Sequence, residues 1–234
     1  MKCLVFLLSA MLMTSAFAAD FTNESEAGIA VANGNTKSQT YNLKQENGLK
    51  FDANILKFKA RFLNTYSNND ESARYILGSL RYERELNEKF SLFVEEGLES
   101  DKFAGYELRH NNDIGGKYNI YKVENFYWFV EAGYRYVNEK LNNGSHIYKN
   151  SLRAYTETEK KWTETVSTKY FLEYIPNLKE SKDYQINTEL SVSAALSTMF
   201  SIKTAFLLRY DHLPAPGTTT KTDTLLTTAL VAKF

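Results

Sequence analysis

Apolar and polar side chains alternate with a period of two along most of the chain. The windows 55–66, 184–195 and 200–211 show this most clearly, with apolar or β-branched side chains at every second position and polar or charged ones between them. A period of two places alternate side chains on opposite faces of a β-strand, whereas an α-helix repeats about every 3.6 residues. The pattern therefore predicts an all-β protein.

Twelve such segments follow one another. We predict strands at about 25–32, 38–51, 55–66, 73–84, 89–100, 106–118, 125–137, 147–158, 165–175, 184–195, 200–211 and 222–234. Most are longer than the 5–6 residues usual in globular proteins and suit strands that cross a bilayer at a tilt. After residue 20 no apolar stretch is long enough for a spanning helix, so entry into a membrane would require a closed barrel. We therefore expect a transmembrane antiparallel up-and-down β-barrel of about twelve strands, an even number as in bacterial barrels.

The connections differ between the two ends of this barrel. Short ones, expected as periplasmic turns, are Asp52–Asn54, Leu86–Glu88, Lys160–Glu164 and Leu196–Met199. Longer polar ones, expected as external loops, are Ser67–Ser72, Asn138–His146, Asn177–Lys182 and His212–Lys221. Long and short connections on opposite sides are typical of outer-membrane barrels. The first external connection, near Asn33–Lys37, is short and departs from the trend.

The first twenty residues have a different composition. Lys2 precedes an apolar run from Leu4 to Met13, and Ala16-Phe17-Ala18 matches a small-residue cleavage site. These are the parts of a secretory signal peptide, and the apolar run is too short for a spanning anchor. We expect cleavage near Ala18, so that residues 1–18 are removed and residues 19–234 form a single barrel domain.

The predicted last strand carries a candidate assembly signal. Leu230, Ala232 and Phe234 alternate on one face, and Phe234 is the carboxyl terminus. A terminal aromatic residue that closes an alternating strand resembles the signal that outer-membrane barrel assembly machinery reads. Together with the signal peptide, this feature favours the bacterial outer membrane over the alternative, a soluble periplasmic β-protein.

Composition adds two observations. Aromatic residues make up 14% of the chain, with 16 Tyr and 15 Phe, which suits the aromatic girdles of a membrane barrel. The formal net charge is zero, so nucleic acid is not an expected partner. The expected partners are outer-membrane lipid, the assembly machinery, and small solutes or ions.

If the apolar faces meet lipid, the charged faces converge in the lumen. The main candidates are Lys57, Lys59, Arg61, Glu95, Glu99, Arg109, Glu131, Arg135, Lys203 and Arg209. The same faces carry Glu46, Glu83, Glu107, Asp113, Glu157, Glu173, Glu189, Lys44, Arg81, Lys117, Arg153 and Lys169. The two signs are nearly balanced, and charges in a narrow lumen are costly unless paired. Two interpretations stay open: an interior of salt bridges that holds the barrel in shape, and a narrow water-filled channel.

Five polar side chains fall on predicted lipid faces. They are Gln45, Asn47, Glu96, His110 and Asn112. Either β-bulges re-aim them or they lie near an interface.

Signatures of enzymes are mostly missing. The sequence has no G-x-S-x-G elbow, no H-E-x-x-H motif and no glycine-rich phosphate loop. Asp211-His212 is similar to the acid–histidine pair at the rim of the omptin proteases, with Asp101 as the candidate second acid. Three scattered histidines do not suggest a metal site, and we expect no cofactor. A hydrolase with a rim site near Asp211 and His212 is the alternative to a non-enzymatic barrel.

Six short pieces of sequence together resemble one family. They are Gly34-Asn35-Thr36, Asp101–Gly105, Glu131–Tyr136, Arg209-Tyr210-Asp211, Pro214–Gly217 and Lys221-Thr222-Asp223. Their order and spacing are similar to the salt-induced outer-membrane protein family of proteobacteria, over residues 24–234. The resemblance implies an outer-membrane barrel linked to salt or osmotic stress, and it brings no catalytic residues. Our leading hypothesis is a non-enzymatic barrel of the Gram-negative envelope, either structural or a narrow, weakly selective, porin-like pore.

Overall fold

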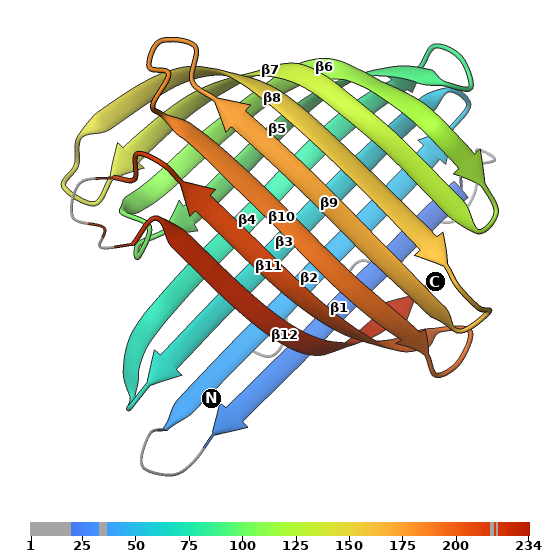
Figure 1. Ribbon diagram of the computed structural model, residues 1–234, viewed down its shortest axis with the longest axis horizontal. Coiled ribbons are helices and arrows are strands. Elements are labelled where there is room, and N and C mark those ends of the chain that lie inside the picture. The colour runs from blue at the N-terminus through green and yellow to red at the C-terminus, as the bar shows by residue number, and fades with distance from the viewer. Residues whose placement is uncertain (1–19, 33–36, 216–217, 219) are drawn as a thin grey trace.

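The computed structural model describes residues 20–32, 37–215, 218 and 220–234. They contain the strands β1 (Asp20–Ala32), β2 (Ser38–Phe51), β3 (Asn54–Ser67), β4 (Asp70–Glu85), β5 (Phe90–Asp101), β6 (Tyr106–Val123), β7 (Phe126–Leu141), β8 (His146–Lys161), β9 (Val166–Pro176), β10 (Tyr184–Ala195), β11 (Phe200–Asp211) and β12 (Thr222–Lys233). Each strand pairs with its neighbours in sequence, and β12 returns to β1 to close the barrel (Figure 1). The predicted all-β, twelve-stranded antiparallel barrel is confirmed. None of the described residues belongs to a helix long and apolar enough to cross a membrane.

The main differences from the predicted strands are extensions. β6 continues to Val123, five residues beyond the predicted end, and β7 continues to Leu141. A bulge in β6 between Asn119 and Tyr121 shifts the pairing with β7 by one residue. Because a bulge reverses which residues face the lumen, it interrupts the alternation from which the end of this strand was predicted.

The two ends of the barrel differ less than expected. β1 begins and β12 ends at the end that holds the short connections, which we call the turn end; the opposite end is the loop end (Figure 1). The prediction of longer loops is correct for residues 177–183 and 212–221. It is wrong for Ser67–Ser72, which contains a turn of only Asn68 and Asn69, and for Asn138–His146, where residues 142–145 connect the strands. Polarity overestimates these loops because polar side chains can continue a strand beyond the membrane.

Backbone conformation explains how the two tight connections form. Asn68 and Asn69 both have positive φ, 52° and 72°, as the two-residue type I′ hairpin requires, and asparagine tolerates this region well. Gly144 has a φ of 82° in the connection between β7 and β8. The connection at residues 33–37 lies mostly outside the described residues.

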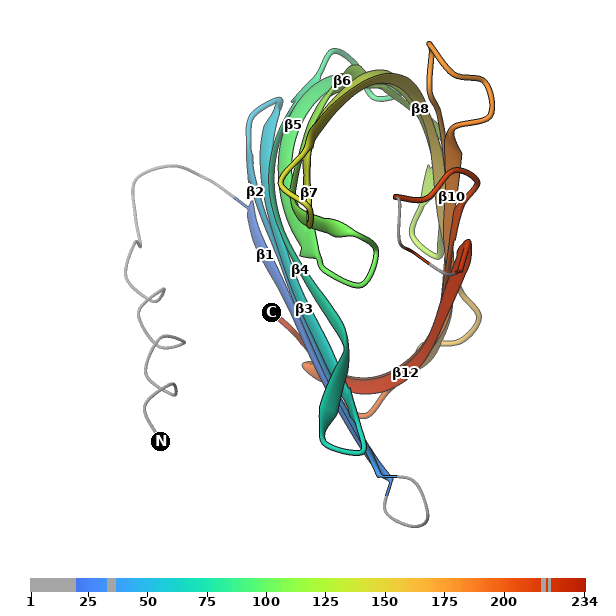
Figure 2. The same ribbon diagram turned by 90° about the vertical axis from the view of Figure 1, so that its left-hand side faces the viewer.

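The barrel closes through a short seam. β1 and β12 pair where Glu24–Ala27 lie opposite Leu230–Lys233, although both strands continue toward the loop end. The two strands are still in close contact at Gly28, just beyond the paired residues, because a Cβ on Gly28 would lie 2.8 Å from the backbone oxygen of Thr228. Figure 2 looks along the barrel from the loop end and shows the strands around an oval interior.

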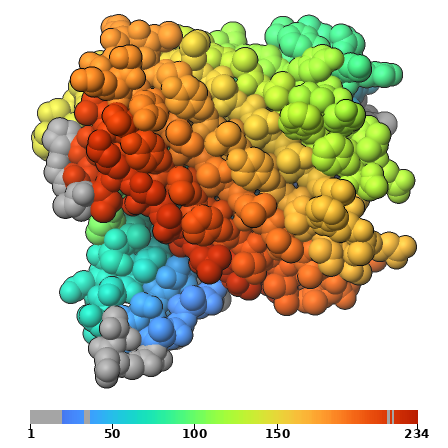
Figure 3. Space-filling model, viewed as in Figure 1, coloured from blue at the N-terminus to red at the C-terminus, as the bar shows by residue number. Residues whose placement is uncertain are grey.

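Large apolar side chains cover the outer face. Exposed examples near the middle of the strands include Leu43, Phe58, Leu80, Val94, Leu98, Ile114, Leu152, Leu190, Phe206 and Leu230. The outer surface of β9–β12, in orange and red, occupies the middle of the face seen in Figure 3. Exposed aromatic residues lie toward both ends: Tyr118, Tyr121, Trp128, Trp162 and Phe200 at the turn end, and Tyr66, Tyr136, Tyr148 and Tyr174 at the loop end. An apolar band between two aromatic girdles is the outer surface of a transmembrane barrel.

The polar residues on the outer face bond to one another. Asn23 Nδ2 donates to Asn47 Oδ1 (2.7 Å), and Gln45 Nε2 donates to the same oxygen (2.8 Å). The hydroxyl of Ser25 donates to Gln45 Oε1 at 2.6 Å. A similar outward pair joins Glu96 Oε1 and His110 Nδ1 at 3.2 Å. Mutual hydrogen bonds lower the cost of placing polar groups near lipid. The pairs β1–β2 and β5–β6 therefore need no bulge to turn these side chains toward the lumen.

A pair of glycines lies on the inner wall between β6 and β7. Gly115 is directly opposite Gly133. A Cβ on Gly115 would lie 2.6 Å from the backbone oxygen of Ala132 and 2.8 Å from the ring of Phe93. Gly115 thus leaves room for the ring of Phe93. The guanidinium of Arg81 stacks on this ring, 3.8 Å from its centroid.

Candidate functional site in the barrel lumen

The strand register places all ten main charged candidates on the inner face of the barrel. They alternate with lipid-facing neighbours in β3, β5, β6, β7 and β11, and each lines the central cavity. Of the twelve further candidates, Glu107 is wrong. It lies beside a shift in pairing at the start of β6 and is exposed, with one carboxylate oxygen 2.5 Å from the outward Lys140.

A network of arginines and carboxylates fills one wall of the lumen. Glu131 accepts hydrogen bonds from Arg81 at 2.7 and 3.1 Å and from Arg153 at 2.7 Å. Arg135 binds Asp113 through two bonds of 2.6 and 2.7 Å. Arg153 also donates to a carboxylate on β9, Glu173 (2.6 Å). Each buried charge in this network therefore faces an opposite charge, as low-dielectric surroundings require.

Glu83 extends this network toward the turn end. It is almost completely buried, with 1% of its surface exposed. Arg81 donates to it at 3.2 Å, and Lys57 and Lys117 each donate at 3.3 Å. Glu83 thus links cations from three strands, β3, β4 and β6, on the lumen wall.

A second cluster crosses the seam between the two ends of the chain. Lys203 on β11 donates to Glu26 on β1 at 3.0 Å, and Asn42 on β2 donates to the same carboxylate at 3.0 Å. Lys44 lies 3.5 Å from Glu26 and 3.4 Å from Glu189 on β10. Sequence reasoning missed Glu26, although it alternates with Ala27 and Ser25 in the predicted first strand and is a charged residue on the inward face.

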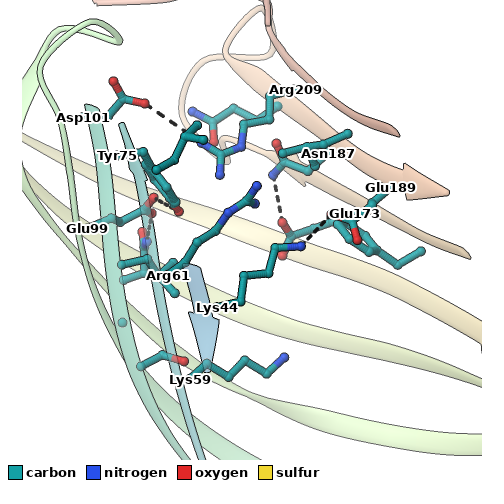
Figure 4. A pocket seen from close by; sticks show the side chains of 18 of the residues that line it. Lys44, Lys59, Arg61, Tyr75, Glu99, Asp101, Glu173, Asn187, Glu189 and Arg209 are labelled. Carbon is teal, nitrogen blue, oxygen red and sulfur yellow. Dashed lines mark hydrogen bonds and ion pairs between the residues drawn. The ribbon is translucent and has the colours of Figure 1, made fainter. Parts of the chain in front are cut away.

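A third cluster lies toward the loop end. Arg109 Nε donates to Glu139 at 2.5 Å, and Tyr75 donates its hydroxyl to Glu99 at 3.0 Å. The guanidinium carbon of Arg209 stands 4.0 Å from the centroid of the Tyr75 ring, and that of Arg61 stands 6.0 Å from it. Figure 4 shows Arg61 and Arg209 reaching into the lumen from β3 and β11. The sequence pattern places Tyr75 at the inner face of β4, but no charge marks it as part of a site.

The lumen encloses a cavity of about 1230 Å³. Its lining includes Glu24 and Lys233 near the turn end and Thr220 and Lys221 at the loop end. The cavity therefore reaches from one end of the barrel to the other beside the charged clusters. Its wall is mixed: β3 contributes the cations Lys57, Lys59 and Arg61, of which Lys57 is paired with Glu83, and the rest of the paired network lies on β4 to β9.

The side chains of Asp211 and His212 bond to different residues. Asp211 faces inward, where its carboxylate accepts a hydrogen bond from Gln185 at 2.9 Å. His212 stacks on the ring of Tyr184 with centroids 4.7 Å apart, and its Nδ1 bonds to the hydroxyl of Tyr210 at 2.7 Å. The candidate second acid, Asp101, lies 4.0 Å from Arg209. Asp211, His212 and Asp101 therefore each contact a different residue.

Both the sequence and the fold of this chain are similar to known proteins. A family described as "Protein of unknown function, DUF481" matches residues 25–234. The fold is similar to that of the NanC porin, with a TM-score of 0.52, 7% identity, and coverage of 92% of this chain and 98% of that chain. It is also similar to an outer membrane channel from Pseudomonas putida F1, with a TM-score of 0.56, 11% identity, and coverage of 95% and 97%. No curated protein matches the sequence.

Proposed function

The chain belongs to the DUF481 family, and from this premise we propose that it is a non-enzymatic outer-membrane barrel that acts as a narrow, weakly selective channel. The observation that carries the proposal is the cavity of about 1230 Å³, whose lining extends from Lys233 at the turn end to Lys221 at the loop end. A lumen filled by its own side chains would serve only to hold the barrel in shape. A cavity that is lined by charged side chains and whose lining reaches both ends would give small solutes and ions a path through the apolar band.

Weak selectivity follows from the arrangement of charge. Most carboxylates in the lumen are bound to cations of other strands, as Glu131 on β7 is to Arg81 on β4 and Arg153 on β8. Paired charges largely cancel at a distance, so the wall presents no ring of one sign such as those that select ions strongly. The side chains of Asp211 and His212 bond to different residues, and this supports the channel over a hydrolase at the rim.

Passage of small solutes can be tested in liposomes that contain the refolded protein. Gly97 lines the cavity, and a Cβ there would stay at least 3.7 Å from its neighbours. We expect Gly97→Phe to fold and to slow the efflux of small uncharged sugars severalfold. The matched control is Leu98→Phe, one residue away on the lipid face. Equal efflux from wild-type protein, Gly97→Phe and protein-free liposomes would contradict the channel.

Export and assembly are part of the same proposal. We propose that residues 1–18 are cleaved near Ala18 and that residues 19–234 are assembled as one domain by the barrel assembly machinery. Support comes from the shared outward face of Leu230, Ala232 and Phe234, of which Phe234 is 60% exposed. Phe234→Ser should lower the amount of mature protein in the outer membrane. Unchanged amounts, or a mature amino terminus other than Ala19, would contradict this part.

A link to salt or osmotic stress rests on the sequence resemblance alone. We propose that production of the protein rises when the external salt concentration is raised. Quantification of the protein by immunoblotting after an osmotic upshift tests this directly, and a constant amount would dispose of the link.

A further inference from the structure

Two guanidinium groups flank one tyrosine in the loop-end half of the lumen. Tyr75 is buried, with 5% of its surface exposed. Arg209 stacks on its ring at 4.0 Å, and Arg61 lies 6.0 Å from the same ring centroid. Because both distances refer to one ring, the two cations lie near each other. Figure 4 shows the guanidinium of Arg61 pointing into the open lumen between Arg209 and Lys44.

Arg61 has no anionic partner among the residues that the structure describes. Its Nε is buried and makes no hydrogen bond within the described parts of the chain. Arg209 has one salt bridge there, to Asp101 at 4.0 Å. That distance is at the limit for an ion pair, and the other oxygen of Asp101 accepts hydrogen bonds from the backbone of Phe103 and Ala104. The two arginines thus keep most of their hydrogen-bonding capacity.

Asp223 lies opposite Arg209 in the register of β11 and β12 and lines the cavity, but the described residues show no salt bridge between the two. Three other carboxylates near the two arginines are bound elsewhere. Glu99 accepts the hydroxyl of Tyr75 at 3.0 Å and an amide hydrogen bond from Asn111. Glu189 lies 3.4 Å from Lys44 and 3.6 Å from Lys203. Glu173 is held by Arg153 at 2.6 Å and by an amide group on β10. None of these three carboxylates forms a salt bridge with Arg61.

We propose that Arg61 and Arg209 bind the carboxylate or phosphate group of a small solute in the lumen. The planar guanidinium fork matches both oxyanions and forms two parallel hydrogen bonds to either. An incompletely paired cation in a confined lumen is costly, and a bound oxyanion would offset that cost. This inference rests on the proposed channel, since the solute reaches the site through the cavity, and it adds a preference for oxyanions to that channel.

Calorimetric titration of the refolded protein in a zwitterionic detergent tests the site without requiring current or flux. The probes are inorganic phosphate and succinate, with uncharged succinamide as the ligand control. Arg61→Gln and Arg209→Gln should each weaken binding at least about tenfold, because each removes one fork. Arg84→Gln is the matched control, since Arg84 is exposed on the outer face beside Asn54. Arg61→Gln breaks no salt bridge between described residues, so it should fold.

Each result has a definite meaning. Binding of phosphate alone or succinate alone, lost in both lumen variants, supports the site and identifies the group that it prefers. Absence of binding, or binding that survives in correctly folded Arg61→Gln and Arg209→Gln, overturns it. Binding without solute flux would leave the site intact and contradict the channel, whereas flux without binding would contradict the site alone.

Discussion

At the scale of single residues, the lumen is organised by how each charge finds a partner. The alternation of the sequence was sufficient to place the charged residues on the inner face, because a period of two allows only one inward set. It could not show which charges pair, since Arg81 and Glu131 are 50 residues apart in sequence and lie on strands that do not pair with each other. Nor could it show that Asn23 supports Asn47, because that contact depends on the register of β1 against β2.

The buried salt bridges lead to a prediction about stability. Glu131→Gln would leave Arg81 and Arg153 without their shared carboxylate, and breaking a buried pair costs about 3–5 kcal/mol. We expect the free energy of unfolding in urea to fall by this amount. Glu107→Gln is the control, because Glu107 pairs with the exposed Lys140 at the loop end of β6, and exposed ion pairs contribute little to stability. Equal effects of the two substitutions would show that Glu131 is not the centre of the network.

The facing glycines give a second prediction at this scale. A valine at position 133 would bring its Cβ within 2.7 Å of the backbone oxygen of Ile114, and overpacking of this kind costs about 1–3 kcal/mol. Gly133→Val should therefore lower the free energy of unfolding and slow refolding in detergent. Gly78→Val provides the comparison, since a Cβ on Gly78 has no atom within 4 Å. Equal unfolding midpoints for Gly133→Val and the wild-type protein would be incompatible with the tight contact.

At the scale of the elements, strands were more predictable than their connections. Ten or more alternating residues fix a strand, because each adds to the same pattern. A hairpin such as Asn68-Asn69 depends on two backbone angles, and the polar residues around it are compatible with both a loop and a strand that extends into water. The bulge at Asn119 has no marker in the sequence.

The seam between β1 and β12 is the element for which the structure predicts a measurable weakness. Pairing stops at Ala27, so residues 29–32 of β1 have β2 as their one paired neighbour among the described strands. Backbone amides without a partner exchange hydrogen with solvent more quickly than paired ones. Hydrogen exchange in detergent micelles should be faster in residues 29–32 than in the middle of β3. Equal protection of the two segments would mean that the seam is paired along its full length in solution.

At the scale of the whole molecule, the proposed channel rests on the closed barrel, the apolar band and the cavity whose lining reaches both ends. The sequence predicted the barrel and the near balance of lumen charge, but it left an open lumen and a plugged one as alternatives. That distinction depends on side-chain packing around Tyr75 and Phe93 and on which cations remain without partners. Those properties arise from contacts between strands that are far apart in the sequence.

The most direct test of an open lumen is the single-channel conductance of the refolded mature protein in a planar bilayer. A parallel sample carries Lys57→Gln, Lys59→Gln and Arg61→Gln, which remove the row of cations on β3 that lines the cavity. The channel predicts a steady conductance that changes in this variant, because ions pass along that wall. A silent bilayer, with protein shown to be folded and inserted, would contradict the channel and mean that the ion pairs of the lumen close it.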